Sequence, residues 1–316
     1  MRKTNLKSAR LLQFLIPFTF FLTVSSCSLF LSAPSLPARH ALVIGIADYQ
    51  STRINDLFYT DDDAMSMADL LAAQGWDVEE TLIDSDASKA GIISAIQNLL
   101  ESVPKGDYAL IYYSGHGTES NGTSYLVPYD YDINSNSKLI SEDELAALFS
   151  SYAKTDNLIF IADSCFSGGF IPDTEVLDAV PSDYSASRFS TKEAFPFFAF
   201  KNLAALVQNN ADSDGTLVPM VISAAGSLEF SYEDFRPEAY NYLKLYQHGI
   251  FTYFFLKAAY FGDVNRDGFV TATEAYHYAT SSIAKEWNRK YGTWGWDFYP
   301  HISGGLRDIV LFSNKP

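Results

Sequence analysis

Cysteine is scarce in this chain of 316 residues, which contains only Cys27 and Cys165. Two cysteines exclude the disulfide framework that holds many small secreted domains together. The apolar content of 47%, with 15% aromatic residues, is instead ample for a large hydrophobic core. If Cys27 is modified, as argued below, Cys165 is a lone thiol, which calls for a search for catalytic partners.

Basic residues are also few, with 22 Lys and Arg against 38 Asp and Glu. Four of the basic residues lie before residue 27, so the rest of the chain carries an excess of 20 negative charges. A surface of this sign repels phosphate backbones. We therefore expect no nucleic-acid partner.

The apolar run near the N-terminus, "LLQFLIPFTFFLTV" at residues 11–24, is short for a helix that spans a membrane. Four basic residues precede it and the small residues Ser25 and Ser26 follow it, which is the pattern of an export signal. The tetrapeptide "VSSC" resembles a bacterial lipobox, which implies cleavage before Cys27 and lipid attachment to its sulfur. An ordinary cleaved signal peptide or an uncleaved anchor is the alternative.

These features predict a lipoprotein-type signal peptide at residues 1–26 and a tether at 27–39. The protein is then exported to the cell envelope, where Cys27 anchors it to a membrane.

Residues 40–313 alternate apolar strands with amphipathic helices, and we see no second compositional domain. This rhythm predicts a single α/β domain with right-handed crossovers and a mainly parallel sheet that helices cover on both faces. A hairpin-like return is expected at 124–130. Strands are expected at 41–46, 77–83, 108–114, 157–163, 217–225 and 308–312, and helices at 62–73, 88–102, 141–152, 249–261 and 272–290.

The pattern weakens between Ile171 and Thr216 into a polar and aromatic insertion. Such a segment is long for a loop inside a compact domain, so we interpret 171–216 as either functional or partly disordered.

Two of the predicted strands end in reactive side chains. The strand at 108–114 leads into "SGHG" with His116, and the strand at 157–163 leads into "DSCFSGG" with Cys165. Ligands bind at the carboxyl ends of strands in open parallel sheets, so the two side chains are expected on neighbouring or near-neighbouring strand ends. A histidine there can take the proton of a thiol whose ordinary pKa leaves it mostly un-ionised, and backbone N–H groups can stabilise an oxyanion.

Each residue alone also fits a bland role, His116 in a turn and Cys165 at the edge of the core. Their joint position at paired strand ends favours catalysis. Packing or surface roles suit the other four histidines better: His40, His248, His277 and His301.

The motifs "ALVIGIADY", "TDDDAMSMADLLAAQGWDV", "YYSGHG", "YLVPYD" and "IADSCFSGG" together resemble the caspase, metacaspase and paracaspase group of peptidases, including bacterial caspase-domain proteins. The interval of 49 residues between His116 and Cys165 agrees with caspase spacing. The resemblance implies a caspase-like three-layer sandwich and a cysteine endopeptidase that hydrolyses peptide bonds with a Cys–His dyad. Cys165 would be the nucleophile and His116 the general base and acid, with the backbone N–H groups of Gly117 and Cys165 holding the oxyanion.

The resemblance departs from true caspases at the nucleophile, where "DSC" stands in place of Gln-Ala-Cys. In metacaspase-like relatives the matching acids line the first specificity pocket, which implies substrate-binding roles for Asp163 and Asp63. Ser114 is expected to line the same pocket. An anionic pocket favours a basic side chain, so we expect a polypeptide substrate cleaved after Arg or Lys. The acids at 61–63 are also compatible with a simple acidic cluster at a helix N-terminus.

The insertion 171–216 occupies the place of the family's intersubunit linker. Arg188, Lys192 and Lys201 are then candidate sites of self-cleavage, although basic residues in an acidic loop need no special reason.

The segment "DVNRDGFVTATE" at 263–274 fits a twelve-residue EF-hand calcium loop. Gly268 occupies the sharp turn at position 6, and helical patterns flank the segment. We expect Ca²⁺ binding there, although the chemistry itself needs no cofactor; an acidic turn without a metal is the alternative. The expected ligands are Asp263, Asn265, Asp267, the carbonyl of Phe269, Thr271 and Glu274.

Two other functions stay open. One is a catalytically silent caspase-like module that binds a partner at the envelope, and the other is a thiol hydrolase or transpeptidase that uses the same dyad. The presence of both Cys165 and His116 argues against the silent module.

Overall fold

The computed structural model describes residues 36–132, 138–164, 200, 202–210, 217–225, 231–233, 247–294, 297–305 and 309–313. The expected signal peptide, Cys27 and Cys165 lie outside these ranges, as do Arg188, Lys192 and Lys201. The chain divides into two compact units, Met1–Leu36 and Pro37–Pro316, each defined by its internal contacts. The fold described below is that of the second unit.

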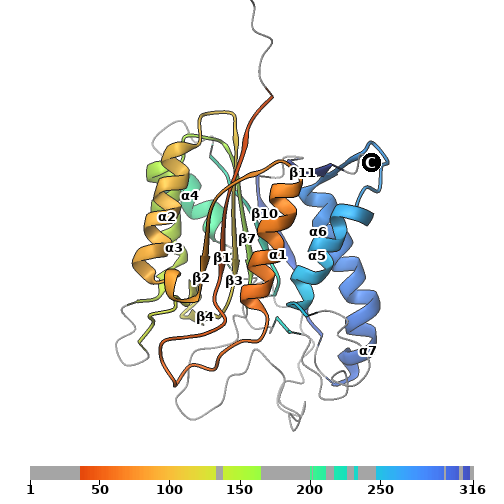
Figure 1. The fold of residues 1–316 in the computed structure, drawn as a ribbon, viewed down its shortest axis with the longest axis horizontal. Coiled ribbons are helices and arrows are strands. Elements are labelled where there is room, and N and C mark those ends of the chain that lie inside the picture. Colours follow the sequence, from red (N-terminus) through yellow and green to blue (C-terminus); the bar gives the residue numbers. More distant parts are fainter. Residues whose placement is uncertain are drawn as a thin grey trace, which may run out of the picture. The chain divides into compact units, whose positions relative to one another are not determined.

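A six-stranded sheet in the order β10-β8-β7-β3-β1-β2 runs through the middle of this unit (Figure 1). Five strands are parallel, and β10 pairs antiparallel with β8 at one edge. The strands are β1 (Arg39–Gly45), β2 (Asp77–Ile83), β3 (Tyr108–Ser114), β7 (Asn157–Asp163), β8 (Met220–Ser223) and β10 (His301–Gly304).

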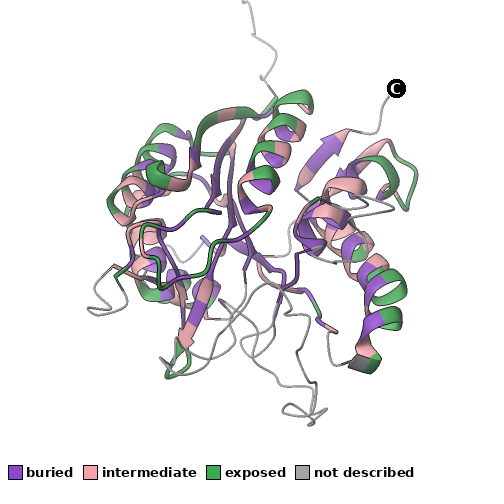
Figure 2. Cartoon of the chain, turned by 60° about the horizontal axis from the view of Figure 1, so that its bottom comes forward, coloured by how far each residue is buried: buried purple, intermediate pink, exposed green. Residues whose placement is uncertain are grey.

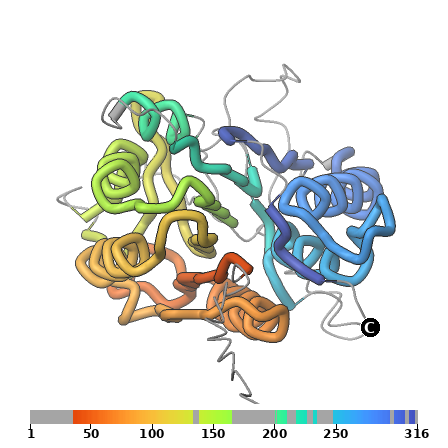
Figure 3. The backbone as a smooth tube through the Cα atoms, turned by 90° about the horizontal axis from the view of Figure 1, so that it is seen from above, coloured from red at the N-terminus to blue at the C-terminus, as the bar shows by residue number. Residues whose placement is uncertain are grey.

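Helices cover both faces of this sheet, so its central strands are buried on both sides (Figures 2 and 3). One face packs against α2 (Lys89–Ser102), α3 (Glu142–Tyr152) and α4 (Leu203–Asn210). The other packs against α1 (Thr60–Ala73), α5 (Ile250–Phe261) and α6 (Ala272–Ser282). The expected three-layer α/β fold with a mainly parallel sheet is confirmed.

The alternation of side chains along β1 shows why the strand reads as a continuous apolar run. Leu42 and Ile44 belong to the core on one face, and Ala41 and Val43 belong to the core on the other. A strand covered on both faces needs apolar residues at every position.

Smaller elements complete the fold. β4 (Gly117–Ser120) and β5 (Thr123–Leu126) form the expected hairpin, which β6 (Ile140–Ser141) extends. β9 (Phe269–Thr271) pairs with β11 (Val310–Ser313). Helical turns occupy Asp84–Asp86, Ile283–Asn288, α7 (Arg289–Tyr291) and Gly292–Trp294.

The strands β9 and β10 were not expected from the sequence. The structure also adds detail to the predicted elements in two places. Part of the 171–216 insertion is ordered core, because Phe200 is fully buried and α4 packs Leu203 and Val207 against the sheet. The helix expected at 272–290 becomes α6, the π-helical segment Ile283–Asn288 and then α7. In the part of the chain described above, no helix has both the length and the apolar character needed to cross a membrane.

We expect Phe160→Ala to lower the free energy of unfolding by about 3–5 kcal/mol, because the truncation leaves a cavity in the central strand β7. The Phe160 ring lies 6.1 Å from that of Phe149 and 5.1 Å from that of Phe200, centroid to centroid. Urea unfolding measures the loss. Tyr260→Ala, at a side chain that is 65% exposed, serves as the control and should change stability by less than about 0.5 kcal/mol. Equal losses in the two variants would contradict this packing.

Candidate active site

The two strands expected to carry the catalytic residues are direct neighbours. β3 and β7 pair in parallel with Ser114 opposite Asp163, and the amide of Gly115 donates to the carbonyl of Asp163 at 3.2 Å. His116 follows the end of β3 by two residues, and Cys165 follows the end of β7 by two. Cys165 itself lies outside the described residues and comes directly after Ser164, the last described residue of this segment.

Contacts on three sides hold His116, which is only 5% exposed. Its amide donates to the Tyr49 hydroxyl at 2.7 Å, and its carbonyl accepts from the Tyr113 hydroxyl at 2.7 Å. The Nε2 atom lies 2.7 Å from the carbonyl oxygen of Asn55. A carbonyl can only accept, so Nε2 carries the hydrogen and Nδ1 is the ring nitrogen that can take up a proton. Gly117, the expected oxyanion residue, begins β4 directly after His116.

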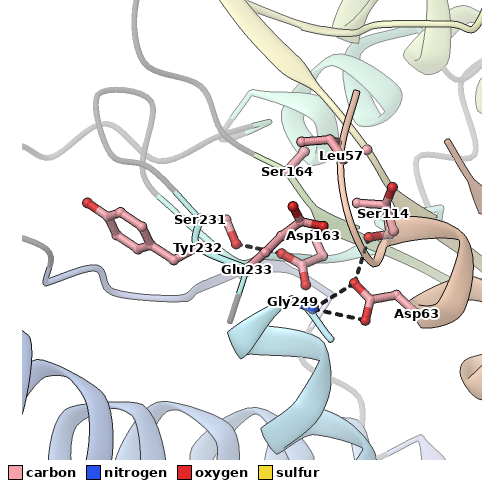
Figure 4. A pocket seen from close by; sticks show the side chains of 11 residues that line it. Leu57, Asp63, Ser114, Asp163, Ser164, Ser231, Tyr232, Glu233 and Gly249 are labelled. Carbon is pink, nitrogen blue, oxygen red and sulfur yellow. Dashed lines mark hydrogen bonds between the residues drawn. The ribbon is translucent and has the colours of Figure 1, made fainter. Parts of the chain in front are cut away.

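A pocket with an empty volume of about 250 Å³, including its open mouth, lies at the same edge of the sheet (Figure 4). It contains the three residues expected to bind substrate. Its lining consists of Leu57, Thr60, Asp63, Ser114, Gly115, Asp163, Ser164, Ser231, Tyr232, Glu233 and Gly249.

Asp63 extends from the first turn of α1 and is fully buried. Its Oδ1 lies 2.9 Å from Nδ1 of His248, and its Oδ2 accepts from the Ser114 hydroxyl at 3.0 Å. The amide of Gly249 donates to both oxygens, at 3.0 and 3.1 Å. Burial raises the pKa of Asp63 to about 7, and the charge of Asp163 adds to this rise, whereas His248 and Ser114 oppose it.

Asp163 ends β7 and is 5% exposed. Its Oδ1 accepts from the Ser231 hydroxyl at 2.6 Å. Its Oδ2 accepts from both the amide and the hydroxyl of Thr252, at 3.1 and 2.6 Å. The Thr252 hydroxyl also lies 2.5 Å from the Tyr112 hydroxyl, which extends the network into the core.

Gly249 allows the two carboxylates to approach each other from opposite sides (Figure 4). A Cβ atom at this position would lie 2.6 Å from Oδ2 of Asp163 and 2.8 Å from Oδ2 of Asp63. Both distances are too short for any side chain. Any larger residue where the chain enters α5 would therefore displace at least one of the two carboxylates.

Two more lining residues support the pocket. The Glu233 carboxylate accepts from the amides of Phe58 and Tyr59 at 2.7–3.0 Å, which fixes the entry into α1. The Ser164 side chain is 2% exposed, and its hydroxyl has no hydrogen-bond partner among the described residues. A buried hydroxyl without a partner in a pocket lining indicates a position where a ligand can contribute the missing bond.

Several residues of the site escaped the sequence analysis. Tyr49, Asn55, Ser231, Glu233 and Thr252 act through long-range contacts that no local pattern reveals. His248, for which we expected a packing or surface role, contacts the pocket residue Asp63. In the sequence, the one sign of a site at this position is the pair His248-Gly249 directly before an apolar helix.

The expected calcium loop lies between α5 and α6, away from the pocket lining. Its turn has the required shape, since Gly268 has φ +87° and its amide donates to Oδ2 of Asp263 at 3.0 Å. The Glu274 carboxylate instead accepts from the amide and hydroxyl of Thr271 in a capping box. His40, Asp77 and Glu79 lie outside this loop, and their ligand atoms are within 4.8 Å of one another. Within the described ranges, no other group of three or more His, Cys, Asp or Glu side chains meets this criterion.

Stability should depend on pH through Asp63. The folded chain retains a proton that the unfolded chain loses between the ordinary pKa of 3.8 and about 7. The free energy of unfolding should therefore fall as pH rises through this window, by up to about 1.4 kcal/mol per pH unit. Asp63→Asn removes the titrating group and should flatten this slope in urea unfolding at pH 5, 6, 7 and 8. The exposed α1 variant Asp69→Asn serves as the control, and parallel curves for wild type and Asp63→Asn would contradict the assignment.

Comparisons with known proteins agree on one family. The model of the caspase domain family matches residues 38–257. Metacaspase-6 of Arabidopsis thaliana is 31% identical over 44% of this chain and 40% of its own length, and metacaspase-9 of the same plant is 26% identical over 61% and 65%. The chain thus spans between about two fifths and two thirds of the length of these relatives.

Solved structures support the fold alone. Protein GSU0716 from Geobacter sulfurreducens superposes with a TM-score of 0.56 at 18% identity, over 89% of this chain and 98% of that one. Caspase-1 from Spodoptera frugiperda superposes with a TM-score of 0.52 at 11% identity, over 90% and 95%. Sequence match and fold together assign this chain to the caspase-domain family of cysteine peptidases.

Proposed function

We propose that this protein is a cysteine endopeptidase that cleaves polypeptides after Arg or Lys. The observation that carries the proposal is the pocket with two buried carboxylates, Asp63 and Asp163, at the strand edge that also bears His116. Two anions in a buried pocket favour a cationic side chain over a neutral or acidic one.

Cys165 is the proposed nucleophile and His116 its base. Nδ1 of His116 takes the thiol proton while the sulfur attacks the carbonyl carbon of the scissile bond. The negative oxygen that forms is held by the amides of Gly117 and Cys165. When the C–N bond breaks, His116 gives the proton to the leaving amine, and a thioester remains on Cys165.

Water completes the cycle. His116 takes one proton from a water molecule as its oxygen attacks the thioester, and the sulfur leaves with that proton. The contact of Nε2 with the Asn55 carbonyl supports this role, because it keeps the ring in the tautomer that accepts at Nδ1.

A peptide reporter panel tests the dyad and the pocket. Cys165→Ala and His116→Ala should each lower kcat/KM for Arg and Lys reporters by about a thousandfold or more. Asp163→Asn should lower it ten- to hundredfold, about 1.4–2.7 kcal/mol, because a charge-assisted bond to the substrate is lost. The exposed Asp143→Asn variant on α3 is the control.

Each outcome of the panel has a meaning. Equal turnover by wild type and Cys165→Ala would remove the dyad mechanism, and cleavage after Asp alone would overturn the pocket assignment. A wild type that binds but never cleaves peptides would favour the silent module. Turnover of esters or of acyl transfer to amines, without peptide hydrolysis, would favour the thiol hydrolase or transpeptidase.

We also propose that the protein acts at the cell envelope, anchored to a membrane by lipid on Cys27. The basic N-terminal residues, the apolar run at 11–24 and the "VSSC" tetrapeptide support this location.

The loop at 263–274 is a proposed Ca²⁺ site that stabilises the fold. The backbone turn at Gly268 supports it, and Glu274 would have to leave its capping bonds to reach the ion. Because a ligand that binds only the folded state adds RT ln(1 + [L]/Kd), millimolar Ca²⁺ should raise Tm by several degrees, and EGTA should reverse the gain. Asp263→Asn should abolish this shift, and Asp69→Asn should retain it. A shift that survives Asp263→Asn would exclude this loop as the site.

A further inference from the structure

His248 precedes Gly249, the lining residue at which the chain enters α5, and its side chain is 18% exposed. Its Nδ1 atom is 2.9 Å from Oδ1 of Asp63. We propose that His248 is a positioning residue of the substrate pocket, whose ring N–H favours the ionised form of the Asp63 carboxylate and orients it toward a bound arginine or lysine side chain. This inference rests on the proposed preference for a basic residue before the scissile bond.

The contacts of Asp63 show why His248 differs from the other donors. The Ser114 hydroxyl and the Gly249 amide also donate to this carboxylate, but neither donor can carry a positive charge. When Asp63 is ionised its carboxylate only accepts, so Nδ1 of His248 then carries the hydrogen in this contact. A histidine that also takes a proton on Nε2 adds a full positive charge to the same bond.

The surroundings of Asp63 make this support necessary. Asp63 is fully buried and feels the negative charge of Asp163, and both effects favour its neutral form. The hydrogen bond and the charge of His248 oppose them. Among the described residues, the other titratable groups near the pair are Tyr112 on β3, Asp163 on β7, Glu233 of the segment that bridges to Gly249, and Asp61 and Asp62 in the first turn of α1. Among these groups, His248 alone can carry positive charge.

The pair also couples substrate affinity to pH. When Asp63 takes up a proton, near its raised pKa of about 7, the pocket loses one negative charge. Binding of a basic side chain should therefore weaken as the pH falls through the range near 7.

The role of the ring N–H can be tested with H248N and H248Q. These two variants differ only in the position of their side-chain amide. The amide nitrogen of Asn falls near the position of Nδ1, whereas that of Gln falls near Nε2. In the Cys165→Ala background, calorimetry measures binding of one peptide with arginine before the scissile bond and of its neutral citrulline counterpart, at pH 6, 7 and 8. His277→Asn, at an exposed histidine of α6, is the control.

We expect H248Q to weaken binding of the arginine peptide about tenfold at pH 7, the order of a lost charge-assisted contact, with little change for the citrulline peptide. H248N should stay within about threefold of wild type. In the active enzyme the same loss should appear in KM and leave kcat nearly unchanged. If H248Q does not fold, H248A with and without added imidazole replaces it, and imidazole should restore arginine binding.

Unchanged arginine binding in H248Q would overturn the inference, as would an equal loss for both peptides or the same loss in H248N as in H248Q. A wild type that neither binds the arginine peptide in preference to citrulline nor cleaves it would instead refute the proposed function itself.

Discussion

Two buried carboxylates that meet at the start of one helix are the constraint around which this active site is built. Removing two like charges from water is costly, and a low-dielectric setting strengthens their repulsion. The structure offsets this cost with the first amides of α5, from Gly249 to Asp63 and from Thr252 to Asp163. The positive end of the helix dipole acts in the same place. The pocket is therefore anionic because α5 begins there.

The same strands carry both recognition and chemistry. β3 supplies Ser114 and continues to His116, and β7 supplies Asp163 and continues to Cys165. On each strand the pocket residue and the catalytic residue are two positions apart along the chain. Buried side chains on both faces of the sheet fix the register between the two strands. A slip of one residue would move every side chain of a strand into the opposite core. The stability of the sheet thus maintains the offset between the pocket and the dyad.

The fold was largely predictable because its strands and helices follow simple periods. The apolar runs predicted parallel strands at β3 and β7 with neighbouring or near-neighbouring ends, and they predicted a hairpin-like return near β5. α4 was missed because eight residues inside a polar and aromatic segment give a weak helical pattern, and β10 was missed because its four residues are only partly buried. Both are stabilised by tertiary contacts rather than by local preference.

The residues of the candidate site also fall into two groups, those that the sequence could identify and those that it could not. Asp63, Ser114, His116 and Asp163 lie at motif positions, so the resemblance could select them. Tyr49 and Asn55, which hold His116, and Ser231 and Glu233, which complete the pocket, have no motif of their own. Their roles depend on which loop meets which strand end, and a single sequence does not contain that information in any local form.

The parallel pairing of β7 with β8 has a consequence for the integrity of the molecule. These neighbours lie on either side of residues 165–216 in the chain, yet Ile159 pairs with Met220 and Ala162 with Ser223 inside one sheet. A break in the peptide chain anywhere between residues 171 and 199 would therefore yield two polypeptides that share one hydrophobic core. Phe200 and α4 would remain with the second polypeptide and pack against α3 of the first. The nicked protein would behave as a heterodimer held together without a covalent link.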